Sequence, residues 1–399
     1  MRRILFVDDE QRVLDAFKRS LHVYRDQWEM TFEPSAENAL KTLANNPPDQ
    51  QIDVIISDIR MPEMDGVTLL KKVQDKHPGI VRIILSGYTE MESALQSVPV
   101  AHQFLNKPCE AQKVKEIIER AFQLQSTLNN QAIKDVVGKI DQLPVLPTVY
   151  KELTSALGDP DVTVKGVAGI VEKDVALSSK ILQVVNSAFF GLPRTVSTVS
   201  NAVSMLGLNM TKNLSLTLKV FHGFEEDAKK LGFSISNFQS HCIQTGQIAK
   251  TLLPVKFEAE AAFLAGTFHD LGKLILATKI QDKFKEIMAK LKTPDDDPCQ
   301  VEMEILGITH AEIGAYLLGI WGLPNPIVEA VAHHHQPSRV PHSTMDIMGA
   351  VHVANYLSYI KDKKTDKAVS LLDSQFLLDL NLSDQITEWS KKILLEEVN

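Results

Sequence analysis

Cysteine and long apolar runs are both scarce in this chain of 399 residues. The three cysteines, Cys109, Cys242 and Cys299, form no CxxC pair. This spacing excludes a disulfide scaffold and a thiolate zinc site, and it fits a reducing cytoplasm. No stretch approaches the roughly 18 consecutive apolar residues of a membrane-spanning helix. The apolar run before Asp8 is too short for the core of a signal peptide. We therefore expect a cytoplasmic protein with no membrane segment.

An excess of basic residues is also missing. The chain has 42 lysines and arginines against 50 acidic residues, a formal net charge of −8. Such a balance gives no electrostatic footprint for wrapping nucleic acid. No helix-turn-helix is recognisable either, so we expect no DNA partner. The apolar and charged fractions, 44% and 23%, are those of an ordinary globular protein. At about 100–200 residues per domain, this length predicts two or three domains.

Short apolar runs alternate with helix-period segments over residues 1 to about 128. The runs lie at 4–7, 28–32, 54–56, 83–85 and 103–105. Between the first two, Val13, Leu14, Phe17 and Leu21 repeat at helical spacing. Apolar runs alternating with helices predict a parallel sheet that helices cover on both faces. We expect an α/β, doubly wound, five-stranded parallel sheet, with a site at the carboxyl ends of its strands.

Polar residues follow four of these runs: Asp8, Asp9, Asp58, Ser86 and Lys107. Parallel strands would bring all of them to one edge of the sheet. Clustered carboxylates repel one another unless a cation lies among them, and oxygen ligands of this type favour Mg²⁺. A carboxylate beside that ion could attack a phosphoryl group, with Lys107 and Ser86 contacting other phosphoryl oxygens. The alternative is a set of unrelated residues at loop tips.

Residues 1–125 resemble the receiver domain of a two-component response regulator. The matching pieces are VDDE at 7–10, DIRMPEMDG at 58–66, LSGY at 85–88 and FLNKP at 104–108. The resemblance implies a flavodoxin-like fold and makes Asp58 the phosphoacceptor. It implies four Mg²⁺ ligands: Asp8, Asp9, Asp58 and the backbone carbonyl of Arg60. Ser86 and Phe104 would be the switch pair, and Lys107 would contact the phosphoryl group. Gly87 stands where alanine is common, and it would open access to the acyl phosphate.

Beyond residue 128 the pattern becomes helical. We expect a linker helix at 126–140, one all-α domain at 141–360 and a helical tail at 361–399. In the tail, a helix is predicted over 382–398 with Ser383 as its N-cap. The acidic run at 295–297 reads as a solvated loop. The apolar stripe of 114–128 continues through Ile133, Val136 and Val137. It fits helix packing against the receiver or, alternatively, a helix through which two copies form a homodimer.

Histidines are concentrated in the helical region. Eight of the twelve lie between residues 241 and 352: His241, His269, His310, His333, His334, His335, His342 and His352. The adjacent His269 and Asp270 could both reach one metal ion at a helix end. Histidine with carboxylate suits Fe, Mn or Zn, and a paired site could activate water for phosphodiester hydrolysis. The alternative is that these are buried histidines bonded to neighbouring groups.

The segment 143–215 resembles the HDOD output domain, a helical family related to the HD and HD-GYP phosphohydrolases. The matching pieces are EKD at 172–174, NSA at 186–188 and the segment 202–207. The resemblance extends over about 140–360 and implies an HD-type fold. Residues that fit the HD-GYP ligand order are His241, His269, Asp270, His310, His334 and His335.

Two departures from the HD-GYP pattern bear on catalysis. Asn355 stands at the position of the final aspartate, and no GYP segment follows His335. Lys273 matches the lysine after the HD pair and would be the catalytic candidate if the domain were hydrolytic. The missing carboxylate leaves little charge to hold two ions. We therefore expect at most a single transition metal (Fe, Mn or Zn) and no efficient hydrolysis.

These inferences favour a phosphorelay response regulator. A sensor histidine kinase would phosphorylate Asp58, and a non-catalytic HDOD domain would bind a downstream protein or nucleotide. We expect the receiver to act on the helical domain through a rigid linker. Two alternatives stay open. One is a receiver-gated, metal-dependent phosphodiesterase for cyclic di-GMP, and the other is a degenerate regulator of such an enzyme.

Overall fold

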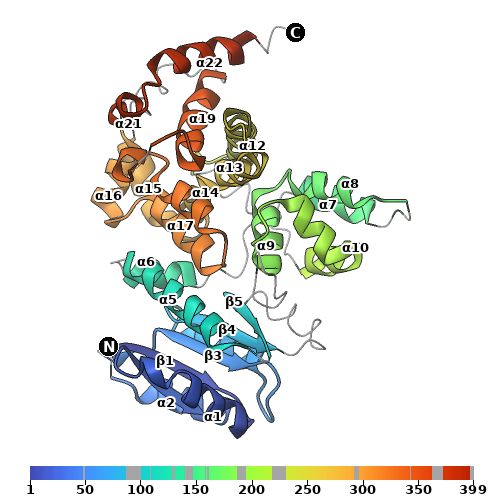
Figure 1. Ribbon diagram of the computed structural model, residues 1–399, viewed down its shortest axis with the longest axis vertical. Coiled ribbons are helices and arrows are strands. Elements are labelled where there is room, and N and C mark those ends of the chain that lie inside the picture. Colours follow the sequence, from blue (N-terminus) through green and yellow to red (C-terminus); the bar gives the residue numbers. More distant parts are fainter. Residues whose placement is uncertain are drawn as a thin grey trace. The chain divides into compact units, whose positions relative to one another are not determined.

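The computed structural model divides the chain into two compact units. It describes residues 1–47, 50–86, 100–107, 109–127, 131–138, 140, 147–157, 159, 161–186, 195–217, 231–291, 296–341, 343–361 and 372–395. The first, which we call the sheet unit, comprises 1–142 with 183–195 and 319–322. The second, the helical unit, holds 143–182, 196–318 and 323–399. Figure 1 draws the chain from blue at the N-terminus to red at the C-terminus.

The sheet unit is built on parallel strands in the order β2-β1-β3-β4-β5. Their bounds are β1 (Arg2–Val7), β2 (Trp28–Glu33), β3 (Val54–Asp58), β4 (Val81–Ser86) and β5 (Gln103–Asn106). Each apolar run of the sequence lies in one strand, which confirms a parallel α/β sheet. Every residue of β3 and β4 is buried, as expected of strands covered on both faces.

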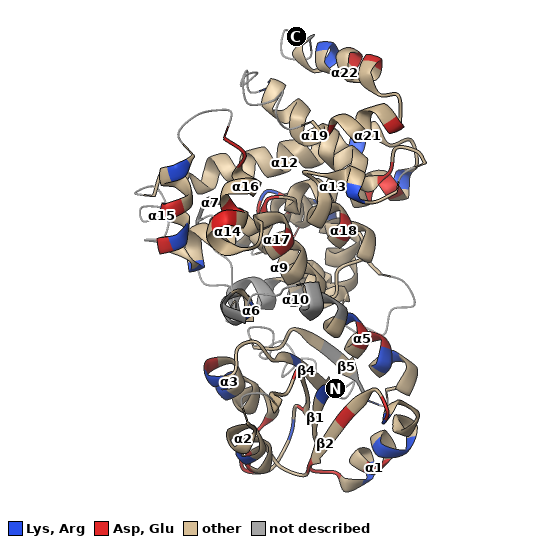
Figure 2. Ribbon diagram, turned by 90° about the vertical axis from the view of Figure 1, so that its left-hand side faces the viewer, with Lys and Arg blue, Asp and Glu red and all other residues tan. Residues whose placement is uncertain are grey.

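Helices cover both faces of this sheet. They are α1 (Gln11–Ser20), α2 (Ala36–Asn45), α3 (Gly66–Lys76) and α5 (Ala111–Thr127). Helix α6 (Gln131–Gly138) follows α5, and the backbone oxygen of its last residue accepts a hydrogen bond from Arg82 at 2.7 Å. Figure 2 shows α2 and α3 on one side of the strands and α1 and α5 on the other. Ser35 caps α2, since its hydroxyl accepts a hydrogen bond from the Asn38 amide at 3.2 Å. The linker helix predicted at 126–140 falls partly outside the described residues, which omit 128–130 and 139.

All elements described from residue 147 onward are helices. The first four are α7 (Pro147–Ala156), α8 (Val164–Val171), α9 (Val175–Asn186) and α10 (Val199–Thr217). The next six are α12 (Ile235–Leu252), α13 (Lys256–Phe268), α14 (Leu271–Lys279), α15 (Gln281–Lys290), α16 (Pro298–Leu306) and α17 (His310–Ile320). The last four are α18 (Asn325–His333), α19 (Ile347–Lys361), α21 (Ser374–Asp379) and α22 (Ser383–Leu395). Helices α13, α18 and α19 pack against one another, and α12 packs on α13 and α19.

One local prediction for the helical unit was wrong. Ser383 is the first residue of α22 rather than its N-cap, and α22 is preceded by the unpredicted α21. Asp297 is exposed, which agrees with the solvated loop predicted for the acidic run. Its carboxylate accepts a hydrogen bond from the Cys299 amide at 2.9 Å and so caps α16, where Pro298 is the first helical residue.

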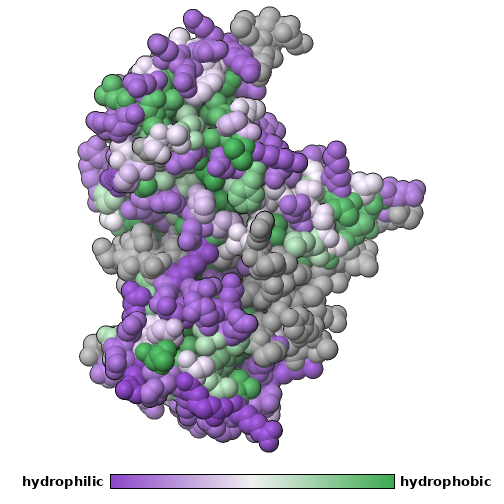
Figure 3. All heavy atoms as spheres, viewed as in Figure 1, coloured by the Kyte–Doolittle hydropathy of each residue, from purple (hydrophilic) through white to green (hydrophobic). Residues whose placement is uncertain are grey.

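Charged and apolar residues are mixed over the surface. Figure 2 shows acidic and basic segments together on α1 and α15, and Figure 3 shows hydrophobic residues among hydrophilic ones. Among the described helices, none has both the length and the apolar character needed to cross a membrane.

Candidate functional site

The strand register brings the predicted polar residues to one edge of the sheet. Val7 pairs with Ser57, so Asp8 and Asp58 follow at the same level. On the next strand pair, Ser86 pairs with Asn106, and the Lys107 amide donates to the Ser86 carbonyl at 2.9 Å. The carboxyl ends of β1, β3, β4 and β5 thus meet where the sequence predicted a site.

A lysine joins two buried carboxylates at this edge. Lys107 Nζ lies 2.7 Å from Asp8 Oδ2 and 2.7 Å from Asp58 Oδ1. Asp8 is fully buried and Asp58 is 6% exposed. Asp9 is exposed, but its carboxylate lies within 4.8 Å of the other two. Three carboxylates and one ammonium leave an excess of negative charge that suits a divalent cation with oxygen ligands, such as Mg²⁺.

Burial dominates the ionisation of this cluster. It raises the pKa of Asp58 to about 6, with a smaller contribution from the charge of Asp8, although Lys107 opposes the shift. Burial also raises the pKa of Asp8. For Lys107, burial acts to lower the pKa, but its bonds to Asp58 and Asp8 outweigh burial and raise it. A nearby cation would favour ionised carboxylates here.

The loop after Asp58 needs the glycine that ends the DIRMPEMDG segment. A Cβ atom at Gly66 would lie 1.9 Å from the backbone oxygen of Asp58, so no larger residue fits without moving the backbone. Asp65 then caps α3, accepting from the Thr68 amide at 2.7 Å. Arg60 lies within this loop, and its carbonyl as an Mg²⁺ ligand stays a prediction.

The predicted switch residues are only partly described. Ser86 is fully buried at the end of β4. Phe104 lies in β5, but its side chain is outside the described residues, as is Gly87. The switch pair therefore stays a prediction.

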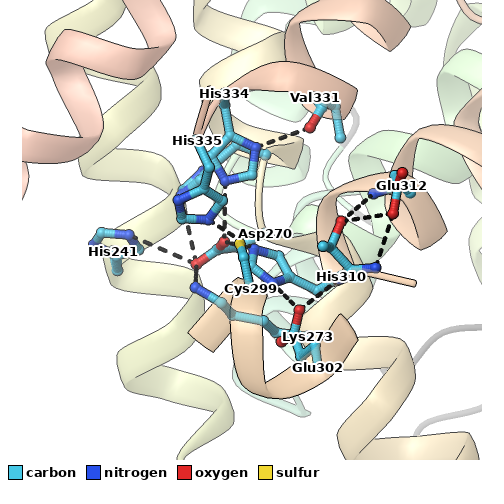
Figure 4. Close-up of polar contacts among 12 residues, drawn as sticks. His241, Asp270, Lys273, Cys299, Glu302, His310, Glu312, Val331, His334 and His335 are labelled. Carbon is cyan, nitrogen blue, oxygen red and sulfur yellow. Dashed lines mark hydrogen bonds and ion pairs between the residues drawn. The ribbon is translucent and has the colours of Figure 1, made fainter. Parts of the chain in front are cut away.

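A second cluster lies in the helical unit. Figure 4 shows its side chains converging on Asp270. His241 comes from α12, whereas His269 ends α13 and Asp270 precedes α14. His310 begins α17, and His334 and His335 follow α18. The structure thus brings together all six residues of the predicted ligand set.

Asp270 is the centre of this cluster, which we call the histidine cluster. The distance between the histidine Nε2 and the nearer Asp270 oxygen is 3.2 Å for His310, 3.4 Å for His269, 3.7 Å for His334 and 3.9 Å for His241. Lys273 Nζ donates to Asp270 Oδ2 at 2.7 Å. Burial acts to raise the pKa of Asp270, but its neighbours, foremost His269 and Lys273, hold it well below the usual range.

Backbone carbonyls fix the orientation of two of the rings. His269 Nδ1 lies 2.7 Å from the Gly266 oxygen, and His334 Nδ1 lies 2.8 Å from the Val331 oxygen. A carbonyl only accepts, so each Nδ1 carries the hydrogen and each Nε2 keeps its lone pair. Burial lowers the pKa of both histidines, that of His269 strongly, which keeps them neutral.

The two Nε2 atoms so oriented have no hydrogen-bond partner within the described structure, although both are buried. They face the carboxylate of Asp270 with lone pairs. Unpaired polar atoms are costly in a protein interior, and an ion with affinity for imidazole and carboxylate would satisfy them. This donor set therefore fits a transition metal.

Glu302 is a site residue that the sequence reasoning missed. Its carboxylate, on α16, accepts from both the backbone amide and Nδ1 of His310 at 2.7 Å. Burial acts to lower the pKa of His310, but the charge of Glu302 outweighs it and raises that pKa. Carboxylates in this position orient metal-binding histidines. The signal that could have found it is an acidic residue eight positions before a ligand histidine.

A glycine lets α14 and α17 approach each other at this point. A Cβ atom at Gly272 would lie 1.9 Å from the backbone oxygen of His310. The glycine after the HD pair is therefore required for close packing, and that packing sets the distance between Asp270 and His310.

The position predicted for the last ligand lies on α19. Asn355 is buried, and its Oδ1 has no hydrogen-bond partner among the described residues. Three and four residues further along, Ser358 Oγ lies 3.1 Å from His241 Nδ1, and the Tyr359 ring centroid lies 5.0 Å from that of His241. Helical spacing puts Asn355 on the same face of α19, toward the cluster.

The remaining histidines of the region have other roles or are not described. His352 Nδ1 lies 2.8 Å from the His334 oxygen, and its Nε2 accepts from the Asp373 amide at 3.0 Å. It is thus a satisfied buried histidine that supports the cluster. His342 lies outside the described residues.

A small pocket borders the cluster at His335. This ring approaches His310 with 3.0 Å between the two Nε2 atoms. The pocket, of about 280 Å³, is also lined by Cys299 and Asp373. His335 is thus the residue of the histidine cluster that lines this pocket.

Comparison with protein families accounts for most of the chain. The model for the response regulator receiver domain matches residues 4–119, and the model for the HDOD domain matches 143–337. Together the fold and these matches define a response regulator. Its output domain is an HDOD domain, so the chain belongs to the regulators that join these two domains. The predicted boundaries at 125, 140 and 360 stay predictions.

Individual relatives agree with this assignment over parts of the chain. An uncharacterized protein of Treponema pallidum is 26% identical over 258 residues, which are 62% of this chain and 48% of that protein. The hydrogenase transcriptional regulatory protein HoxA of Cupriavidus necator is 35% identical over 124 residues, 31% of this chain and 24% of that protein. The chain thus spans about half the length of the first relative and a quarter of the second.

One solved structure shows a similar fold over about two thirds of this chain. A virulence factor from Campylobacter jejuni matches with a TM-score of 0.52 at 20% identity, covering 66% of this chain and 97% of that one. At this identity the likeness concerns the fold alone.

Proposed function

We propose that the protein is a phosphorelay response regulator whose Asp58 accepts a phosphoryl group from a sensor histidine kinase. The observation that carries this proposal is the contact of Lys107 with both Asp8 and Asp58 at 2.7 Å. Asp8, Asp9 and Asp58, with the Arg60 carbonyl, would hold Mg²⁺. When bound, that ion would neutralise charge on the cluster and on the phosphoryl group.

In the transfer step, an Asp58 oxygen bonds to phosphorus while the P–N bond of the donor phosphohistidine breaks. The departing imidazole keeps the electron pair of that bond. Lys107, already within 2.7 Å of Asp58, is placed to contact a phosphoryl oxygen, and the Ser86 hydroxyl lies at the end of the neighbouring strand.

Labelling from acetyl phosphate in the presence of Mg²⁺ tests the assignment. Wild type should be phosphorylated, and Asp58→Asn should lose all labelling because the amide removes the nucleophile while keeping its size. Asp75→Asn, an exposed position on α3, is the matched control and should label normally. Labelling of Asp58→Asn at the level of wild type would refute the proposal.

For the helical domain we propose a non-catalytic output role, in which it binds a downstream protein or nucleotide. Asp270 is the carboxylate that lies within 4 Å of His241, His269, His310 and His334, and Lys273 already contacts one of its oxygens. Glu302 is engaged by His310. This charge supports one transition-metal ion rather than the two of a hydrolytic centre. When bound, that ion would pair the buried Nε2 atoms of His269 and His334.

A metal-dependent phosphodiesterase for cyclic di-GMP is the second candidate. The unpartnered Nε2 atoms of His269 and His334, with Lys273 beside Asp270, favour it. Cyclic di-GMP hydrolysis with added Mn²⁺ or Fe²⁺ separates the two roles. We expect wild type to hydrolyse cyclic di-GMP no faster than His269→Ala does. Turnover of about 1 per second or more that His269→Ala abolishes would establish the enzyme instead. If there is no turnover, co-purification with an active HD-GYP enzyme would indicate a degenerate regulator.

A further inference from the structure

A cleft of about 720 Å³ lies in the helical unit, separate from the histidine cluster. Its walls come from two helix pairs that each pack together, α8 with α10 and α12 with α13. None of its lining residues belongs to the histidine cluster. The volume lies within the range of about 300–1,000 Å³ that is common for small-molecule sites.

Three lysines from three different elements line this cleft in a protein of net negative charge. Lys173 follows α8, Lys250 lies near the end of α12 and Lys256 begins α13. Lys173 also pairs with Glu152 at 2.6 Å. Lysines that reach one cleft from separate elements suit an anionic ligand such as a phosphate.

The same elements also carry groups of different chemistry. Glu172 and Glu260 also line the cleft, so a bare phosphate would meet carboxylates as well as lysines. Phe263 contributes an aromatic ring, and Lys250 Nζ lies 5.9 Å from its centroid. Carboxylates accept hydrogen bonds from sugar hydroxyls, and an aromatic ring can stack with a base.

The EKD segment at 172–174 holds one wall in place. Asp174 is fully buried, and its carboxylate accepts from the Leu177 amide at 2.8 Å and from Gln239 Nε2 at 3.2 Å. These bonds fix the turn between α8 and α9 against α12. Because Glu172 and Lys173 belong to that turn, their backbone is positioned at the cleft before any ligand arrives.

We propose that this cleft binds a mononucleotide, with its phosphate on the lysines, its ribose hydroxyls on the glutamates and its base beside Phe263. An apolar ligand would strip the lysines of water, and a purely acidic one would be repelled by the glutamates. This inference rests on the proposed output role of the helical domain, and it gives that role a ligand class. It depends neither on the histidine cluster nor on Asp58.

Isothermal titration calorimetry on the EDTA-treated full chain tests the proposal. The probes are AMP, GMP, CMP, UMP and inorganic phosphate. We expect at least one of the mononucleotides to bind with a stoichiometry of one molecule per chain, and to bind more tightly than inorganic phosphate. Lys250→Gln should weaken it at least about tenfold, since a hydrogen bond to a charged group is lost. Lys290→Gln is the control, because this lysine pairs with Glu304 on the surface and does not line the cleft.

A variant that blocks the cleft without removing charge gives a second readout. A Cβ atom at Gly169 would meet nothing within 4 Å, and leucine is a better helix former than glycine, so Gly169→Leu should fold. It should abolish nucleotide binding, whereas His269→Ala should keep it. The proposal would be overturned if none of the four nucleotides gave a heat of binding at 1 mM, or if inorganic phosphate bound as tightly as the nucleotides. Binding that survives Gly169→Leu and Lys250→Gln would also overturn it. Phosphorylation of Asp58 is measured separately, so a failure of the proposed phosphorelay function can be distinguished from a failure of nucleotide binding.

Discussion

The two clusters of this protein share one contact and differ in what surrounds it. In each, a lysine lies 2.7 Å from a buried aspartate: Lys107 with Asp58, and Lys273 with Asp270. Around Asp58 the further groups are carboxylates, whereas around Asp270 they are imidazoles. The same ion pair can therefore belong to an oxygen site that suits Mg²⁺ or to a nitrogen-rich site that suits a transition metal.

The difference also appears in the ionisation of the two aspartates. Burial raises the pKa of Asp58 to about 6, and the added charge of Asp8 contributes to this shift. Burial acts in the same sense on Asp270, but His269 and Lys273 outweigh it and hold its pKa well below the usual range. Repulsion among carboxylates thus makes the first site require a cation more strongly than the second.

Removal of each lysine should sharpen the comparison most. In metal-free protein, Lys107→Met leaves two buried carboxylates without their ammonium group, and Lys273→Met leaves one. We expect losses in the free energy of unfolding of about 3 and about 2 kcal/mol, reduced by the partial exposure of both lysines. Urea unfolding should show that Mg²⁺ restores stability to Lys107→Met but not to Lys273→Met, which Zn²⁺ or Mn²⁺ should restore. An equal response of both variants to Mg²⁺ would remove the distinction.

Loss of the carboxylate behind His310 should weaken the nitrogen site alone. Glu302→Gln keeps size but removes the charge that His310 Nδ1 contacts at 2.7 Å. Changes in such supporting groups typically cost about 10–100-fold in metal affinity. Competition with a chelator would measure this, with the exposed Glu304→Gln on the same helix as control. Unchanged affinity in Glu302→Gln would show that its carboxylate does not support the site.

The smallest effect we expect is on the stability of the sheet unit against pH. The pKa of Asp58 in the folded state is about 6, above its ordinary value of 3.8. Between these two pH values the folded state therefore binds more protons than the unfolded state. Ionisation then destabilises the metal-free protein above pH 6, and this penalty disappears as pH falls toward 4. In EDTA, Asp58→Asn should be about 1 kcal/mol more stable than wild type at pH 8, after allowance for solvent screening. Wild type more stable than Asp58→Asn at pH 8 would contradict this sign.

The sequence predicted the oxygen site more completely than the nitrogen site, for a physical reason. Asp8, Asp58 and Lys107 each follow an apolar run, and parallel strands necessarily bring such positions to one edge. The histidines needed a family resemblance, because their meeting depends on how helices pack. Glu302 was missed since nothing periodic links α16 to His310. The cleft beside Lys250 was also absent from the predictions, because its walls come from two helix pairs, α8 with α10 and α12 with α13, and only packing brings these pairs together.

Metal content tests most directly the central claim that the two clusters bind different ions. EDTA-stripped wild type, Asp8→Asn and His269→Ala would be equilibrated anaerobically with equal Mg²⁺, Mn²⁺, Fe²⁺ and Zn²⁺, then analysed after removal of free ions. We predict about one transition-metal ion per chain in wild type and in Asp8→Asn. His269→Ala should lose that ion. A transition metal retained by His269→Ala, or lost from Asp8→Asn, would contradict the account.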